Sequence, residues 1–213
     1  MKYCFICFIA NYNMDYKTPE IMSLKHLVDS YKEVALSDTD VMKIIDGKAN
    51  LIRYPEMHKI DNIKQLLEPY GACVILYETK PHYGHWCCIT LRNPETEGFS
   101  KKGKQILEFW DSYGKPIDSQ LSNIPRKYAQ ESHQDVPYLS HLLLKESCPY
   151  KLSYNQYPFQ ELLPGVATCG RWVSLRILLK DAPLELFKEL FHGMYSDEIA
   201  TMITHDKDQG VMK

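Results

Sequence analysis

The chain has 213 residues, of which 45% are hydrophobic and 24% are charged, and its formal net charge at pH 7 is −2. These are ordinary values for one sizeable globular domain, and they exclude both a disordered chain and a membrane chain. A charge this close to zero gives no electrostatic case for nucleic acid as the main partner.

The seven cysteines are an odd number, and Cys87 and Cys88 are adjacent, so no even disulfide framework appears. This pattern favours reduced thiols in a compartment like the cytosol. Cys4 and Cys7 have C-x-x-C spacing, but no second pair with matching spacing follows, so no zinc site is predicted there. No apolar run is long enough to span a membrane, and we expect no membrane partner.

The first 70 residues predict a mainly helical N-terminal part. One helix is expected over 21–31, and a third over 61–67, where apolar residues recur on one face. Between them, Ser37 and the acids that follow it offer a cap and a first turn for a short helix through Val41 and Ile45.

From residue 71 the pattern changes to short apolar runs bounded by turn residues, which is typical of buried strands. Strands are predicted at 72–77, 85–91, 105–110 and 151–155, and later helices at 138–144, from Cys169, at 184–191 and at 197–203. We therefore expect residues 1–213 to form a single α+β domain, with a central mixed β-sheet flanked by helices. Its parts are the helical segment 1–70, a core at 71–205 and a flexible tail at 206–213.

A cysteine stands where a long loop ends and an apolar helix begins, at Thr168-Cys169-Gly170. The dipole of a helix favours a thiolate at its N-terminus, and the thiolate is the nucleophilic form. Cys169 is therefore a candidate nucleophile. An ordinary buried cysteine is the other interpretation of this segment, because free cysteine behaves as a small hydrophobe.

Three further residues complete a catalytic pattern. His85 opens a predicted strand and can take and return a proton, and Asp111 ends the next strand and can orient an imidazole. Gln160 precedes Cys169 in the loop and can donate to a developing oxyanion. Alone, each has a plainer interpretation as a structural histidine, a turn residue or a solvated glutamine. Antiparallel neighbours bring the start of one strand to the end of the other, so we expect His85 and Asp111 at one edge of the sheet.

The order of these segments resembles the adenovirus-protease and SUMO-protease clan (clan CE) of cysteine peptidases, especially the versions carried by large DNA viruses and virophage-like elements. In papain-like enzymes the order along the chain is reversed, with the cysteine before the histidine. The resemblance covers roughly residues 36 to 205. It rests on Gly84-His85-Trp86, Phe109-Trp110-Asp111-Ser112-Tyr113-Gly114, Tyr154-Asn155 up to Gln160, and Thr168-Cys169-Gly170-Arg171-Trp172.

The resemblance implies a papain-like or adenain-like cysteine protease core, with residues 71–205 as its catalytic part. It makes Cys169 the nucleophile, His85 the general base, Asp111 the residue that orients His85, and Gln160 the oxyanion donor. This chain departs from the cellular SUMO proteases, in which the glutamine lies closer to the cysteine and the loop is shorter, and this departure leaves Gln156 as a rival for Gln160.

Two further residues are assigned expected roles because they stand beside the predicted catalytic groups in the sequence. Trp86 follows the base and is expected either to line the substrate groove or to belong to the core. Gly170, which has no side chain, is expected to leave room for substrate beside the thiol.

The function implied is a cysteine endopeptidase that needs neither a metal nor an organic cofactor. The resemblance points to a viral maturation protease that cleaves capsid or core precursors after small, glycine-containing sites, in the virion or the host cytoplasm. The alternatives are an isopeptidase that removes ubiquitin-like modifiers from host proteins and an acyltransferase on the same thiol and histidine. Some relatives are activated by a peptide or by nucleic acid, but the charge of this chain does not support a nucleic-acid activator.

Overall fold

The computed structural model describes residues 19–93, 104–145, 148–191 and 196–208, and its centre is one five-stranded sheet. The strands lie in the order β1-β2-β3-β4-β5. β2, β3 and β4 pair antiparallel, whereas β1 pairs in parallel with β2 and β5 pairs in parallel with β4, so the sheet is mixed, as predicted. The strands are β1 (Asn50–Arg53), β2 (Ala72–Lys80), β3 (Tyr83–Arg92), β4 (Ile106–Asp111) and β5 (Lys151–Tyr154).

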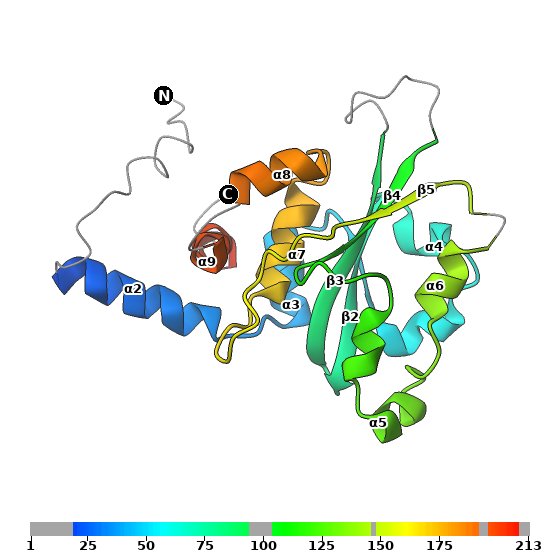
Figure 1. Ribbon diagram of the computed structural model, residues 1–213, viewed down its shortest axis with the longest axis horizontal. Helices are drawn as coiled ribbons and strands as arrows, with labels where there is room; N and C mark the ends of the chain where they lie inside the picture. Colours follow the sequence, from blue (N-terminus) through cyan, green and yellow to red (C-terminus); the bar gives the residue numbers. More distant parts are fainter. Residues whose placement is uncertain (1–18, 94–103, 146–147, 192–195, 209–213) are drawn as a thin grey trace.

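Helices flank both faces of this sheet, which makes the fold α+β (Figure 1). One side carries α3 (Asp38–Ile45), α7 (Cys169–Leu178), α8 (Leu184–Phe191) and α9 (Ser196–Asp208), with α2 (Pro19–Lys32) packed along α9. The other side carries η1 (Tyr54–Lys59), α4 (Lys64–Leu67), η3 (Ser119–Asn123), α5 (Arg126–Glu131) and α6 (Tyr138–Leu143).

Side-chain alternation along the strands divides the core into two clusters. Val74 and Leu76 of β2 belong to the cluster under α3 and α7, and Cys73 and Ile75 belong to the cluster under η1, α4 and α6. Successive residues of a strand point to opposite faces, and here both faces are covered. This explains why β2 reads as an unbroken apolar run instead of an alternating one.

Most boundaries differ from the prediction by a few residues, and three differences have a physical reason or a consequence. β1 is not predicted by the sequence pattern, because its four residues are only half-buried and its position depends on parallel pairing with β2. The third helix begins at Lys64 instead of residue 61: its N-cap is Ile63, and the Lys64 N–H donates to the Asn62 side chain just before it. α9 continues to Asp208, past the expected start of the tail.

One other predicted feature agrees with the structure, and some predicted features lie in residues that the structure does not describe. The Ser37 cap forms a capping box with Asp40 at the start of α3. Cys4 and Cys7 lie outside the described residues, and so do residues 94–103, between the second and third predicted strands. Within the described part of the chain, no helix is long and apolar enough to cross a membrane.

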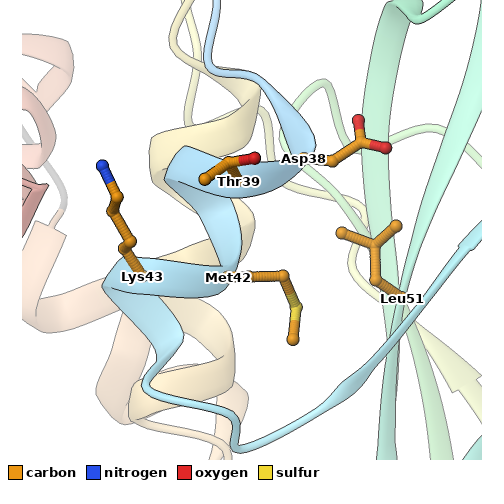
Figure 2. Close-up of a pocket in the computed structure, with 5 residues that line it drawn as sticks. All are labelled: Asp38, Thr39, Met42, Lys43 and Leu51. Atoms are coloured by element: carbon orange, nitrogen blue, oxygen red, sulfur yellow. The ribbon is translucent and has the colours of Figure 1, made fainter.

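A shallow hollow of about 470 Å³ lies between α3 and β1. Met42 and Leu51 extend toward each other across it, while Lys43 points away (Figure 2). Its lining residues come from these two elements alone, not from β3, β4 or α7, and are Asp38, Thr39, Met42, Lys43 and Leu51.

Candidate active site

Cys169 is the first residue of α7, a helix whose residues are buried from Cys169 to Ile177. An aromatic cluster fixes the start of this helix, because the Trp172 ring lies 5.4 Å from that of Phe159 and 6.5 Å from that of Phe187. α7 also packs against β3. The buried apolar residues of α7 therefore hold the Cys169 thiol against β3, the strand that carries His85.

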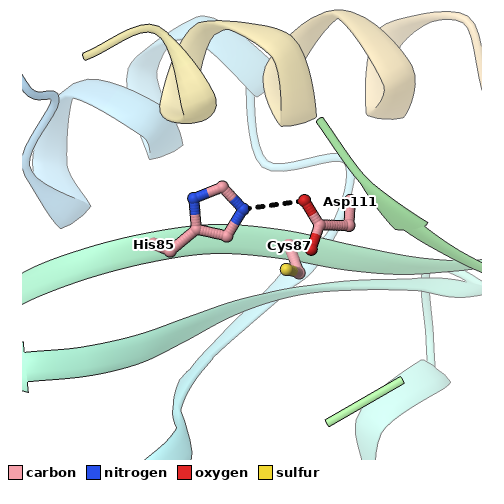
Figure 3. Close-up of side chains that lie close together, drawn as sticks. All are labelled: His85, Cys87 and Asp111. Carbon is pink, nitrogen blue, oxygen red and sulfur yellow. Dashed lines mark hydrogen bonds and ion pairs between the residues drawn. The ribbon is translucent and has the colours of Figure 1, made fainter. Parts of the chain in front are cut away.

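His85 and Asp111 meet at one edge of the sheet. Asp111, the last residue of β4, pairs with Cys87 of β3, two positions along from His85. The His85 Nε2 lies 2.9 Å from Asp111 Oδ1 (Figure 3). The antiparallel pairing predicted from the sequence therefore brings these two side chains into hydrogen-bond contact.

The Asp111 carboxylate accepts several hydrogen bonds at once. Its Oδ1 accepts from the Tyr113 backbone N–H at 2.8 Å, and its Oδ2 accepts from Gln120 Nε2 at 2.6 Å. Burial alone raises the pKa of Asp111, but the hydrogen bond and charge of His85, together with these donors, bring that pKa below its usual range. Asp111 is therefore a buried anion at neutral pH.

The Cys169 thiol and the His85 imidazole lie close enough for each to shift the pKa of the other. Since His85 Nε2 faces Asp111, Nδ1 is the nitrogen that remains for the sulfur. Burial acts against both charged forms, yet the mutual attraction prevails: the pKa of Cys169 is lowered and the pKa of His85 is raised. The backbone N–H groups of Trp86 and Gly170 also favour the thiolate. The pairing therefore favours the thiolate of Cys169 and the imidazolium of His85.

Gln160 and Gln156, the two rival glutamines, lie in different environments. Gln160 is buried, and its Oε1 accepts from Ser112 Oγ at 2.8 Å. Its backbone N–H donates to the Ser112 carbonyl, so the turn that follows Asp111 also positions this loop. Gln156 is exposed. Of the two, Gln160 is the one joined to the turn that carries Asp111.

Trp86 and Gly170 have different surroundings from those a substrate groove would give them. Trp86 is only 3% exposed, and its indole N–H donates to the Leu36 carbonyl, which favours the core interpretation. A Cβ on Gly170 would lie 3.0 Å from Leu36 Cβ and 3.1 Å from Trp86 Cδ1. The missing side chain of Gly170 thus admits these two neighbours, and the room expected there for substrate is occupied by protein.

Three residues near the site are not predicted by the sequence pattern. Gln120 contacts Asp111, and the Tyr113 ring stacks on the His85 ring at 4.5 Å and 13°. Asp197 accepts from Thr168 Oγ1, Trp172 Nε1 and the Glu161 N–H. Tyr113 could be suspected from its place two residues after Asp111, but no local pattern connects Gln120 with Asp111, and the Asp197 contacts join distant parts of the chain.

A metal ion, if one binds, would find three donor atoms within 4.8 Å of one another, from His85, Cys87 and Asp111 (Figure 3). Burial and the charge of Asp111 raise the pKa of Cys87 well above its usual value, so this thiol stays protonated. A protonated thiol is a poor metal ligand, so these three side chains do not favour a metal site.

The chain is 43% identical over 180 residues to the "Uncharacterized protein V9" of Sputnik virophage, an alignment covering 82% of this chain and 96% of that protein. No family model matches the chain. The ASFV pS273R protease resembles it with 12% identity and a TM-score of 0.44, over 94% of this chain and 86% of that one. The central domain of the Lpg1148 protein from Legionella pneumophila resembles it with 14% identity and a TM-score of 0.38, over 84% and 99%. Both structural likenesses are loose, so the chemistry of the site rests on its own geometry.

Proposed function

The chain belongs to the family of the V9 protein of Sputnik virophage, and from the groups around Cys169 we propose that it is a cysteine endopeptidase. The observation that carries this proposal is the 2.9 Å contact of His85 with the Asp111 carboxylate, next to a Cys169 thiol whose pKa His85 lowers. A thiolate paired with an imidazolium, which a third group orients, is the arrangement needed for nucleophilic acyl transfer.

The proposed reaction has two halves. The Cys169 thiolate attacks the carbonyl carbon of a peptide bond, and the carbon–sulfur bond forms as the carbonyl oxygen becomes an oxyanion. His85 then gives its proton to the leaving nitrogen as the carbon–nitrogen bond breaks. A water molecule gives a proton to His85, attacks the thioester and releases the carboxylic acid, which restores the thiolate.

Asp111 and Gln160 have supporting roles in this proposal. Asp111 keeps the His85 ring oriented with Nδ1 toward the sulfur, and its negative charge stabilises the imidazolium. Gln160 is part of the proposed oxyanion site, together with backbone N–H groups at the start of α7. The burial of Gln160 beside Ser112 supports its choice over the exposed Gln156.

The substrates that we propose are precursors of viral structural proteins, cut after small, glycine-containing sites. The virophage relative supports a viral setting. Reduced thiols, expected from the odd number of cysteines, suit a site of action in the host cytoplasm or the virion. Cleavage of ubiquitin-like modifiers and acyl transfer use the same thiol and histidine and are the competing outcomes.

The test compares substrates on one enzyme preparation. The purified chain is incubated with the structural polypeptides of its own virus, with Gly-Gly peptides that carry a fluorophore, and with a ubiquitin–fluorophore conjugate. We expect cleavage of the structural polypeptides and the peptides, and none of it with Cys169→Ala. A clear preference for the intact modifier would contradict the maturation role, and unchanged processing by Cys169→Ala would contradict the peptidase.

A further inference from the structure

Tyr113 lies against three parts of the proposed catalytic machinery. Its backbone N–H donates to Asp111, its ring stacks on His85, and its hydroxyl oxygen lies 3.2 Å from Gln160 Nε2. One residue of the turn after β4 thus touches both the group that orients the base and the proposed oxyanion donor.

Both hydrogens of the Gln160 side-chain amide already have acceptors. Nε2 lies 3.3 Å from the Val166 carbonyl and 3.2 Å from the Tyr113 hydroxyl. The carbonyl of Val166 can only accept, so the nitrogen and not the oxygen of the amide must face it. In this arrangement Gln160 presents no free hydrogen to a substrate.

The Tyr113 hydroxyl, in contrast, has a hydrogen to give. Its oxygen accepts from Gln160, and among the described residues no acceptor lies within hydrogen-bond distance of its own hydrogen. Burial and the negative charge of Cys169 raise the pKa of Tyr113, so the hydroxyl stays protonated beside the thiolate. A hydroxyl that accepts one hydrogen bond also becomes a stronger donor of the next.

We propose that Tyr113 is a catalytic residue whose hydroxyl donates a hydrogen bond to the oxyanion, while Gln160 holds and polarises that hydroxyl. This inference rests on the proposed peptidase reaction. No proton is transferred in this step: the tyrosine keeps its hydrogen, and the hydrogen bond shortens as negative charge develops on the carbonyl oxygen.

The test uses Tyr113→Phe, which keeps the ring that stacks on His85 and removes only the hydroxyl. We expect kcat/KM on a Gly-Gly aminomethylcoumarin peptide to fall about a hundredfold, the usual effect of losing one oxyanion donor. The dissociation constant of a Gly-Gly peptide aldehyde, which forms a hemithioacetal oxyanion with the thiol, should rise by a similar factor. Alkylation by iodoacetamide passes through no oxyanion, so its rate should stay close to that of the wild type.

Tyr128→Phe is the matched control, because its hydroxyl donates to Glu78 and not to the site. A Tyr113→Phe enzyme with wild-type turnover and aldehyde affinity would overturn the inference, as would a parallel loss of turnover and alkylation, which marks a structural role. A wild-type chain that neither cleaves the peptide nor binds the aldehyde would instead contradict the peptidase itself.

A double-mutant cycle separates the two donors. If Gln160 acts through Tyr113, the combined variant of Tyr113→Phe and Gln160→Ala should lose about as much kcat/KM as the more damaging single variant. Losses that multiply would mean that each side chain acts on the oxyanion independently, and the relay from Gln160 to Tyr113 would be wrong.

Discussion

Asp111 influences the thiol without touching it. Its buried negative charge favours the protonated form of His85, and the imidazolium in turn favours the thiolate of Cys169. The thiolate is lost as the pH falls through the lowered pKa of Cys169, and the imidazolium is lost as the pH rises through the raised pKa of His85. Turnover should therefore follow a bell-shaped pH profile.

Asp111→Asn removes that charge and keeps the size of the side chain. The pKa of His85 should fall and the pKa of Cys169 should rise, so the acid limb of iodoacetamide alkylation should move about one unit or more to higher pH. Alkylation rates measured against pH give the midpoint of the acid limb for the wild type and for the variant. An acid limb that stays at the wild-type pH would mean that Asp111 does not control the ion pair.

The two loop glutamines provide a matched pair of substitutions. Gln160→Ala should lower kcat about a hundredfold, because a buried group of the proposed oxyanion site is lost. Gln156→Ala should leave kcat unchanged, because that side chain is exposed. Steady-state kinetics on the same peptide compare the two, and the reverse order of effects would identify Gln156 as the functional residue.

At the scale of elements, the loop 161–168 is fixed at both ends by one buried carboxylate. Asp197, at the start of α9, accepts from the Glu161 N–H at 2.8 Å and from the Thr168 hydroxyl. It also accepts from Trp172 Nε1 at 2.7 Å. Asp197 thus links α9 both to the residue before Cys169 and to the residue after Gln160.

Asp197→Ala should lower the free energy of unfolding by about 3 kcal/mol, because it leaves buried donors without an acceptor. Urea unfolding measures this loss, and Asp181→Ala, at an exposed position, is the control. Equal stabilities of the two variants would show that Asp197 does not hold the loop.

A helix or strand can be predicted from the sequence when its own residues carry the pattern, and much less well when it depends on contacts with other segments. β2, β3, β4 and α7 carry their own signal, because continuous apolar runs between turn residues are a local property. β1 carries little local signal, because its four half-buried residues depend on pairing with β2. Cys169, His85, Asp111 and Gln160 stand out by residue type and order. Gln120 and Asp197 are recognised only in the folded chain, where the turn after β4 brings Gln120 back to Asp111 and α9 brings Asp197 to Trp172.

At the scale of the whole molecule, a buried network of charges joins α7 to the sheet. Glu108 of β4 lies 2.7 Å from Arg176 Nε of α7 and 2.7 Å from an Arg92 guanidinium nitrogen of β3. All three side chains are buried. The helix that begins with the thiol and the strands that carry His85 and Asp111 are therefore connected at a second point inside the protein.

Glu108→Ala should cost about 3–5 kcal/mol of stability, because two guanidinium groups lose their buried counter-charge. Thermal unfolding measures the cost. Below the unfolding temperature, the pH profile of alkylation should match the wild type, since Glu108 does not touch the thiol or the imidazole. A normal melting temperature would mean that this network does not support the fold, and an altered pH profile would place Glu108 in the electrostatics of the site.

The central claim is that Cys169, alone among the seven cysteines, is an activated nucleophile. The most direct test is to treat the intact chain with a Gly-Gly peptide bearing a vinyl sulfone group and to map the modified residue by mass spectrometry. We predict one label per chain, on Cys169, with none on Cys169→Ala and much slower labelling of His85→Ala. Labelling spread over other cysteines, or an equal rate in His85→Ala, would contradict the account.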